Sequence, residues 1–261
     1  GRVMDLGLQN KKALICASSR GLGYACAASL LREGAHVVIN GRDEETLAKA
    51  VVELSEINEN VSGVSADLNT EAGRDALIAA CEDPDILINN NNGPPPGTYQ
   101  QWDEAMWGAA LTSNMVAPAL LIRAVIDGMR ARKFGRIVNI TSAMVKSPHP
   151  NMGLSTAARS GLTAFAKGLS KEVAKDNVTI NNMLPERFDT ARQQQMAELA
   201  MAVKNITYEE VRAEMEATIA AGRLGKPDEF GDACAFLCSA QAGFISGQNL
   251  QLDGGSYAGL I

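Results

Sequence analysis

Histidines and aromatic residues are scarce in this chain. Its 261 residues include two histidines, and Phe, Trp and Tyr together make up 5%. Nucleic-acid-binding surfaces interleave aromatic with basic residues, and the sequence has no such stretch. The formal net charge of -6 also excludes a net basic field that would attract a polyphosphate backbone. No nucleic-acid partner is therefore expected.

Long hydrophobic runs are also missing. No apolar run approaches the roughly 18 to 20 residues of a membrane span. The opening GRVMDLGLQNKK lacks the apolar stretch of a secretory signal. These absences predict a soluble, cytoplasmic protein without a membrane partner. Met4 is interpreted as the natural start, and residues 1–3 as a remnant of expression cloning.

Paired cysteine spacings are the third absence. The number of cysteines is odd and none forms a C-x-x-C motif, which predicts reduced thiols in the core. Two of them, Cys234 and Cys238, share a helix face, but no nearby histidine or second cysteine pair completes a metal site. No metal is predicted. The five cysteines are Cys16, Cys26, Cys81, Cys234 and Cys238.

What the chain does contain is a regular alternation of short aliphatic segments with stretches of helical period. Strands that are apolar on both faces and alternate with helices are typical of a parallel sheet covered on each side. The sequence therefore predicts a single α/β domain, residues 1–261, with a doubly wound parallel sheet of seven strands. The strand segments are 11–18, 35–42, 61–67, 84–90, 135–143, 178–185 and 247–255.

Extra helical sequence lies between the sixth and seventh strands. Residues 188–203 and 207–221 have helix-forming composition, whereas a doubly wound sheet needs only one crossover there. The stretch 186–225 is therefore predicted to be an insertion that serves as a substrate lid.

A glycine pair follows the first strand, in CASSRGLGYACAASLLREGA. Gly21 and Gly23 open a helix, whose N-terminal N–H groups and dipole can hold a pyrophosphate. Ala17 occupies the place of the first glycine in the usual dinucleotide loop, so the G-x-G-x-x-G pattern is incomplete. The alternative is that the glycines only allow close helix packing. The candidate phosphate-binding residues are Ser19, Arg20, Gly21, Leu22 and Gly23.

Three other strand ends favour a nucleotide at the same edge of the sheet. Asp67 is placed to accept from an adenine amino group, and Asn89 lies where open α/β sheets bind ligands. The second strand ends at Gly41 and Arg42, without the acid typical of NAD-binding proteins. Together with Arg20, Arg42 indicates a 2′-phosphate and hence NADP, with NAD possible. The alternative is that both arginines are solvated surface residues.

The phosphate loop, the strand ends and the segments listed below, taken in their order along the chain, resemble those of the short-chain dehydrogenase/reductase family. The resemblance implies a Rossmann-like fold, an NAD(P)-dependent oxidoreductase acting on a carbonyl or alcohol, and cofactor contacts from Leu68, Pro185 and Thr190. AAGRLGKPDEFGDACAFLCS is most similar to the branch called 3-oxoacyl-acyl-carrier-protein reductases. A homodimer or homotetramer through helices 102–131 and 153–174 is also implied. The matching segments are SSRGLG, ADL, INNNNG, SNMVAP, IVNITS, residues 153–172, INNMLPERFDT and LQLDGG.

The resemblance also implies a catalytic set of Asn, Ser and a Tyr-x-x-x-Lys pair. Asn114 and Ser142 match the first two members. The tyrosine position, thirteen residues beyond Ser142, is Ser155, and the lysine position is Arg159. Gly161 follows at the family's spacing, so no shift of register restores the pair.

Serine cannot replace tyrosine as an acid, because its hydroxyl is too weakly acidic and a guanidinium remains protonated. A general acid contributes about 10²- to 10⁴-fold, so weakened or altered catalysis is expected. Arg159 is suited either to the nicotinamide ribose hydroxyls or to an anionic substrate. His149 and Lys146, in the loop after Ser142, are alternative proton donors or simply exposed loop residues.

Other departures from the family pattern surround this site. Asn91 and Asn92 replace Ala-Gly, Glu186 replaces glycine, and the proline-rich segment 93–97 forms one stiff wall. Two alternative functions therefore remain open: a nucleotide-binding pseudoenzyme, and a non-redox lyase or dehalogenase on the same fold. Halohydrin dehalogenases have an arginine at the lysine position, but they retain the tyrosine and lose the nucleotide loop, the reverse of this chain.

Overall fold

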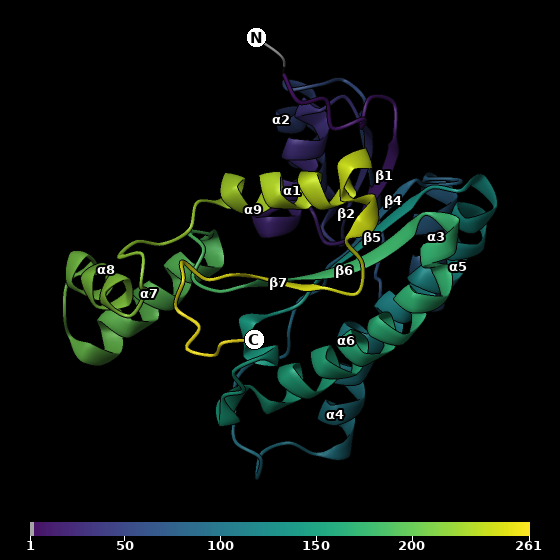
Figure 1. Ribbon diagram of the computed structural model, residues 1–261. Coiled ribbons are helices and arrows are strands. Elements are labelled where there is room, and N and C mark those ends of the chain that lie inside the picture. The colour runs from purple at the N-terminus through teal and green to yellow at the C-terminus, as the bar shows by residue number, and fades with distance from the viewer. Residues whose placement is uncertain (1–2) are drawn as a thin grey trace.

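A computed structural model describes residues 3–261 (Figure 1), and Gly1 and Arg2 of the expected cloning remnant lie outside the described residues. Seven strands form one sheet in the order β3-β2-β1-β4-β5-β6-β7. Every neighbouring pair is parallel, which confirms the doubly wound fold. The strands are β1 (Lys12–Ile15), β2 (His36–Gly41), β3 (Val61–Ser65), β4 (Ile86–Asn89), β5 (Gly135–Ile140), β6 (Val178–Pro185) and β7 (Asn249–Leu252).

Helices cover both faces of the sheet. Successive strand residues point to opposite faces, so Ala13 and Ile15 of β1 join one apolar cluster and Leu14 joins the other. The first cluster includes α1, α2 and α9, and the second includes α3, α5 and α6. The helices are α1 (Gly21–Arg32), α2 (Glu44–Ser55), α3 (Glu71–Ala80), α4 (Glu104–Leu111), α5 (Ala117–Arg132), α6 (Gly153–Val173), α7 (Ala191–Lys204), α8 (Tyr208–Ala217) and α9 (Pro227–Cys238).

The expectation that all strands are apolar and buried on both faces holds only for the middle of the sheet. All residues of β4 and β5 are buried. The edge strands β3 and β7 contain no buried residue, because each has a neighbour on one side only and incomplete cover. All five cysteines are buried and unpaired, as predicted for core thiols.

A row of asparagine side chains crosses four strands near the carboxyl edge of the sheet. The Asn89 amide donates to Asn139 at 2.9 Å, Asn139 to Asn182 at 3.0 Å, and Asn182 to Asn249 at 2.8 Å. Their strand positions are in direct register. Asn89, Asn139 and Asn182 are buried, whereas Asn249 is exposed. Because these amides satisfy one another, the row helps to fix the alignment of the strands from which the site loops depart.

Helices α4 and α5 are joined by the π-helical segment η1 (Thr112–Val116) into one helical stretch, Glu104–Arg132. This corrects the expectation about hydrophobic runs, since the stretch is long and apolar enough to cross a membrane by length and composition, with a mean hydropathy of 1.6 in its best window. Core helices of folded proteins pass the same test. Here 44% of the window is buried, and Leu121, Val125 and Met129 pack into the second apolar cluster.

The predicted insertion forms α7 and α8, which stand away from the sheet (Figure 1). Each helix begins at a threonine cap, Thr190 or Thr207, and each buries a single residue. Phe188, at the root of the insertion, packs edge-on against Phe230 of α9 at a ring distance of 5.4 Å. The insertion is therefore anchored at its base and thinly packed at its end.

Candidate functional site

The N-terminus of α1 is open to an anionic ligand. Arg20 precedes the helix without a side-chain cap, and the first turn has no acid, whereas Asp43 and Thr70 cap α2 and α3. A Cβ at Gly21 would meet no heavy atom within 4 Å, and its φ of +66° favours glycine. Uncapped N–H groups thus face free space at the positive end of a helix dipole, the arrangement that binds phosphate.

The loop before α1 has a backbone conformation typical of glycine at Ala17, where the usual dinucleotide loop has its first glycine. Ala17 adopts a φ of +45°, in the left-handed region. Its N–H donates to Asn40 Oδ1 and its carbonyl accepts from Asn90 Nδ2, both at 3.0 Å. A Cβ at Gly23 would lie 2.5 Å from this carbonyl, so only glycine fits there. Asn40 and Asn90 were not among the predicted site residues. The feature of the sequence that could have indicated them is a polar residue near the end of an aliphatic strand segment.

Two arginines border the far end of the loop. Arg20 and Arg42 are exposed, and neither forms an ion pair within residues 3–261. A Cβ at Gly41 would lie 2.9 Å from Ser19 Oγ, so the loops that carry the arginines pack closely. Asp67 is partly buried and uses Oδ1 to accept from the N–H of Asn69. Its other carboxylate oxygen has no partner in the described chain.

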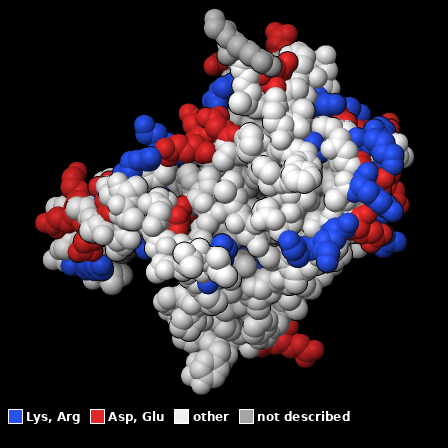
Figure 2. Space-filling model, in the orientation of Figure 1, with Lys and Arg blue, Asp and Glu red and all other residues white. Residues whose placement is uncertain are grey.

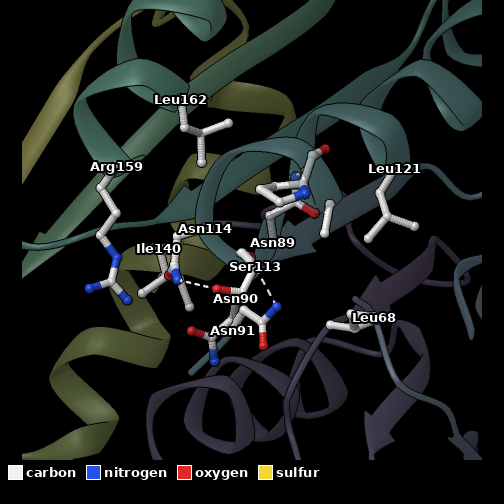
Figure 3. Close-up of a pocket in the computed structure, with 12 residues that line it drawn as sticks. Leu68, Asn89, Asn90, Asn91, Ser113, Asn114, Leu121, Ile140, Arg159 and Leu162 are labelled. Atoms are coloured by element: carbon white, nitrogen blue, oxygen red, sulfur yellow. Dashed lines mark hydrogen bonds between the residues drawn. The ribbon is translucent and has the colours of Figure 1, made fainter. Parts of the chain in front are cut away.

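A pocket opens where β4, η1 and α6 meet, and Figure 3 shows its lining side chains. It brings together four predicted site residues, Leu68, Asn89, Asn114 and Arg159. Its cavity volume is only about 20 Å³, so the pocket by itself does not hold a ligand larger than water. Asn89 is committed to the asparagine row and forms the floor. The other lining residues are Asn90, Asn91, Ser113, Ala117, Pro118, Leu121, Ile140 and Leu162.

Asn114 reaches the pocket because its helix is locally widened. It lies in η1, a π-helical segment, which occurs often at functional sites. Its amide nitrogen donates to Ser113 Oγ at 2.7 Å and to the carbonyl of Asn92 at 3.3 Å. The side chain is therefore held in place, while its Oδ1 has no partner within residues 3–261.

Ser155 and Arg159 lie one turn apart on α6, and their side chains are in contact. Arg159 Nη1 donates to Ser155 Oγ at 2.5 Å, and Ser155 is only 3% exposed. Since Ser155 accepts this bond, its own proton is free to be donated. Burial, and to a lesser extent the charge of Arg192, lowers the pKa of Arg159 to about 10, so the guanidinium remains charged at neutral pH.

Ser155 is not part of the pocket lining, and neither are three other predicted residues, Ser142, Pro185 and Thr190. Ser142 Oγ accepts from the N–H of Met144 at 3.2 Å, which leaves the hydroxyl proton available. Pro185 ends β6, and Thr190 Oγ1 caps α7. The carboxyl ends of β5 and β6, which carry these residues, are adjacent in the sheet.

The alternative proton donors lie in the loop after Ser142. His149 is exposed, and its Nδ1 accepts from the N–H of Asn151. Lys146 is partly buried, with its ammonium 5.3 Å from the ring centre of Tyr257. Each is thus engaged in a contact outside the pocket lining.

The chain is a doubly wound α/β protein in which the first helix after β1 begins without a side-chain cap. The family described as enoyl-(acyl carrier protein) reductase matches residues 16–257. Dehydrogenase/reductase SDR family member 4 of Bos taurus is 32% identical, covering 97% of this chain and 89% of the relative. The 3-oxoacyl-(acyl-carrier-protein) reductase of Vibrio cholerae is 30% identical, covering 97% and 99%.

Among solved structures, L-sorbose reductase from Gluconobacter frateurii, in a complex with NADPH and L-sorbose, has a TM-score of 0.93 and 28% identity, covering 98% of this chain and 100% of that one. The chain therefore belongs to the short-chain dehydrogenase/reductase family of oxidoreductases.

Proposed function

We propose that this protein is an NADPH-dependent reductase that acts on a small carbonyl compound, or on the alcohol in the reverse direction. The observation that carries the proposal is the uncapped, glycine-opened N-terminus of α1, with two unpaired arginines beside it. The NADPH complex of the similar L-sorbose reductase supports the same cofactor.

The residues present fit this cofactor. The N–H groups at Gly21 to Gly23 would hold the pyrophosphate, and Arg20 and Arg42 a 2′-phosphate. The free oxygen of Asp67 would accept from the adenine amino group, and Pro185 and Thr190 would border the nicotinamide half. When bound, the cofactor supplies the hydride for carbonyl reduction.

The chain's own contribution at the carbonyl is hydrogen bonding. Ser142 and Ser155 both retain a proton to donate to a carbonyl oxygen. Arg159, bonded to Ser155, places a positive charge behind that donor and stabilises negative charge that develops on the oxygen. Asn114 is held in place by its hydrogen bonds to Ser113 and Asn92. Without the phenol, proton delivery is slow, and we expect a weak reductase of the 3-oxoacyl-(acyl-carrier-protein) reductase type.

Consumption of NADPH by the full chain over a panel of ketones, aldehydes and 3-oxoacyl thioesters tests the proposal. Turnover of at least one substrate is expected. Tight NADPH binding with no turnover in either direction would instead support a nucleotide-binding pseudoenzyme, which the serine at the tyrosine position favours. Failure to bind NADPH would contradict both functions.

The surface supports two further parts of the proposal. We expect α7 and α8 to close over the substrate as a lid, because their thin packing allows movement. Family resemblance supports a homodimer or homotetramer through Glu104–Arg132 and α6. Met106, Trp107 and Phe165 are exposed there, and the lower face in Figure 2, where Figure 1 places α4, is nearly free of charged side chains.

A further inference from the structure

A second cavity, of about 250 Å³, lies at the base of the insertion that carries α7 and α8. It is lined by residues 186–188 at the start of the insertion, by residues near its end, and by residues 251–255 at the end of β7. It shares no lining residue with the pocket between β4, η1 and α6, and contains none of the predicted site residues. One water needs only about 10–15 Å³, so this cavity has room for a small organic molecule.

The segments around the cavity hold one another in place. At the two ends of the insertion, the Arg187 carbonyl accepts from the N–H of Gly225 at 3.0 Å, and the N–H of Asp189 donates to the Gly225 carbonyl at 2.9 Å. The segment after β7 closes the third side, because a Cβ at Gly254 would lie 2.9 Å from Ile219. In Figure 1 this segment runs toward α7 before it turns back to the C-terminus. The cavity is therefore part of the fold.

Two opposite charges line the cavity without a partner. Glu186 and Arg187 are both half-buried, and neither takes part in an ion pair within residues 3–261. The other charged groups of the lining are occupied. Arg223 donates to Glu229 at 2.9 and 2.7 Å, and Asp253 accepts from two backbone N–H groups. One anion and one cation thus remain for a ligand.

Arg187 has a strained backbone at this position. Its φ of +61° lies in the left-handed region, which is uncommon for residues other than glycine. Such conformations persist only where the surrounding structure holds them, and they are concentrated at functional sites. A glycine here would relieve the strain, but it would also remove the guanidinium from the cavity.

The cavity also has an apolar wall, formed by Phe188, Ile219 and Leu252. Phe188 is 7% exposed and Ile219 is 6% exposed, so both are fixed in the core. Small-molecule sites commonly combine such a wall with a few polar groups that orient the ligand.

We infer that this cavity binds a small amino acid as its zwitterion, with the carboxylate on Arg187, the ammonium on Glu186 and the side chain against the apolar wall. Charge balance selects this class of ligand. An anion alone would be repelled by Glu186 and a cation alone by Arg187, whereas a zwitterion pairs with both. The two charged groups of an α-amino acid are attached to one carbon, which suits two adjacent residues. The site is independent of the proposed reductase function.

Calorimetry on the full chain tests the inference with L-alanine, L-leucine and L-phenylalanine as probes. At least one of them is expected to bind saturably at one site per chain. Its amide, which lacks the carboxylate, and its deaminated acid, which lacks the ammonium, should bind about tenfold or more weakly. For L-leucine these controls are leucinamide and isocaproate. No binding of any amino acid, or equal binding of an amide or a deaminated acid, would overturn the inference.

The same titrations are repeated with excess NADP⁺. Unchanged affinity for the amino acid is expected, because the cavity shares no residue with the proposed nucleotide site. Competition would place the amino acid in the nucleotide cleft and would overturn the inference. If the chain binds the amino acid but not NADP⁺, the proposed function fails and the inference stands.

Variants assign the binding to the two charges. R187G and E186Q are each expected to weaken the amino acid about tenfold or more. R187G retains the left-handed backbone, and N205G is its matched control, because Asn205 follows α7 with a φ of +53° and does not line the cavity. E198Q, at an exposed position of α7, is the control for E186Q. If N205G weakens binding as much as R187G does, or if neither R187G nor E186Q changes it, the inference fails.

Discussion

The phosphate loop and the start of α6 both carry residues other than those that the family resemblance implies, and we expect different consequences in the two regions. At Ala17 the backbone still adopts a left-handed φ of +45°, and Asn40 and Asn90 hold it there. At Ser155 and Arg159 the side chains still meet, but no phenol is present. In general, phosphate is bound by backbone N–H groups at a helix N-terminus, and their positions can stay the same when a side chain changes. Proton transfer depends on the pKa of a particular side chain, and that pKa is lost when the side chain is replaced.

The largest effect is expected from restoring the missing pair. S155Y/R159K places a phenol beside a lysine, and a general acid of this kind is worth about 10²- to 10⁴-fold in kcat. Steady-state NADPH oxidation measures the gain, and S155A is the control that removes the hydroxyl without adding a phenol. An unchanged kcat in a folded, NADPH-binding double variant would mean that the rest of the site has also diverged.

The phosphate loop is tested by adding one methyl group. G23A would place a Cβ 2.5 Å from the Ala17 carbonyl, so the loop must shift, and NADPH affinity should fall about tenfold or more. G108A is the matched control, because a Cβ in that α4 position meets nothing within 4 Å. It should leave affinity unchanged and stabilise the helix by about 0.5–1 kcal/mol. Similar losses of NADPH affinity in G23A and G108A would contradict the role of Gly23 in the phosphate loop.

Arg42, one of the two exposed arginines at the proposed 2′-phosphate site, should contribute to cofactor choice. R42A removes one cation from the proposed 2′-phosphate site, and we expect NADPH affinity to fall about tenfold while NADH affinity stays constant. K49A, on the adjacent helix α2, removes a cation that is 79% exposed and should alter neither affinity. The loss should also shrink at high ionic strength. Equal weakening of NADPH and NADH would contradict the assignment of Arg42.

The smallest effect concerns an ion cluster that belongs to neither region. Lys133 and Arg130 lower the pKa of Asp176 to about 2. The carboxylate therefore stabilises the fold fully above its ordinary pKa near 3.8, and this contribution is lost as the pH falls from about 4 to 2. D176N should lower Tm by a few degrees at pH 7 and by progressively less toward pH 2. A Tm difference that does not depend on pH would exclude this electrostatic origin.

The sequence predicts the sheet, its seven strands and the placement of Ser155 and Arg159 one turn apart on one helix face, because these follow from hydrophobic period and helical spacing. It does not predict that Asn40 and Asn90 clamp Ala17, since that needs three strand ends placed side by side. The sequence also does not predict that β3 and β7 contain no buried residue, because the strands at the edges of the sheet are known only once the strand order is known.

We propose that the chain binds a dinucleotide although serine and arginine occupy the positions where the family resemblance implies a tyrosine and a lysine. Calorimetric titration of the unmodified full chain with NADPH and with NADH tests it most directly. The account predicts saturable binding of one NADPH per chain, about tenfold tighter than NADH. No binding of either nucleotide would contradict it.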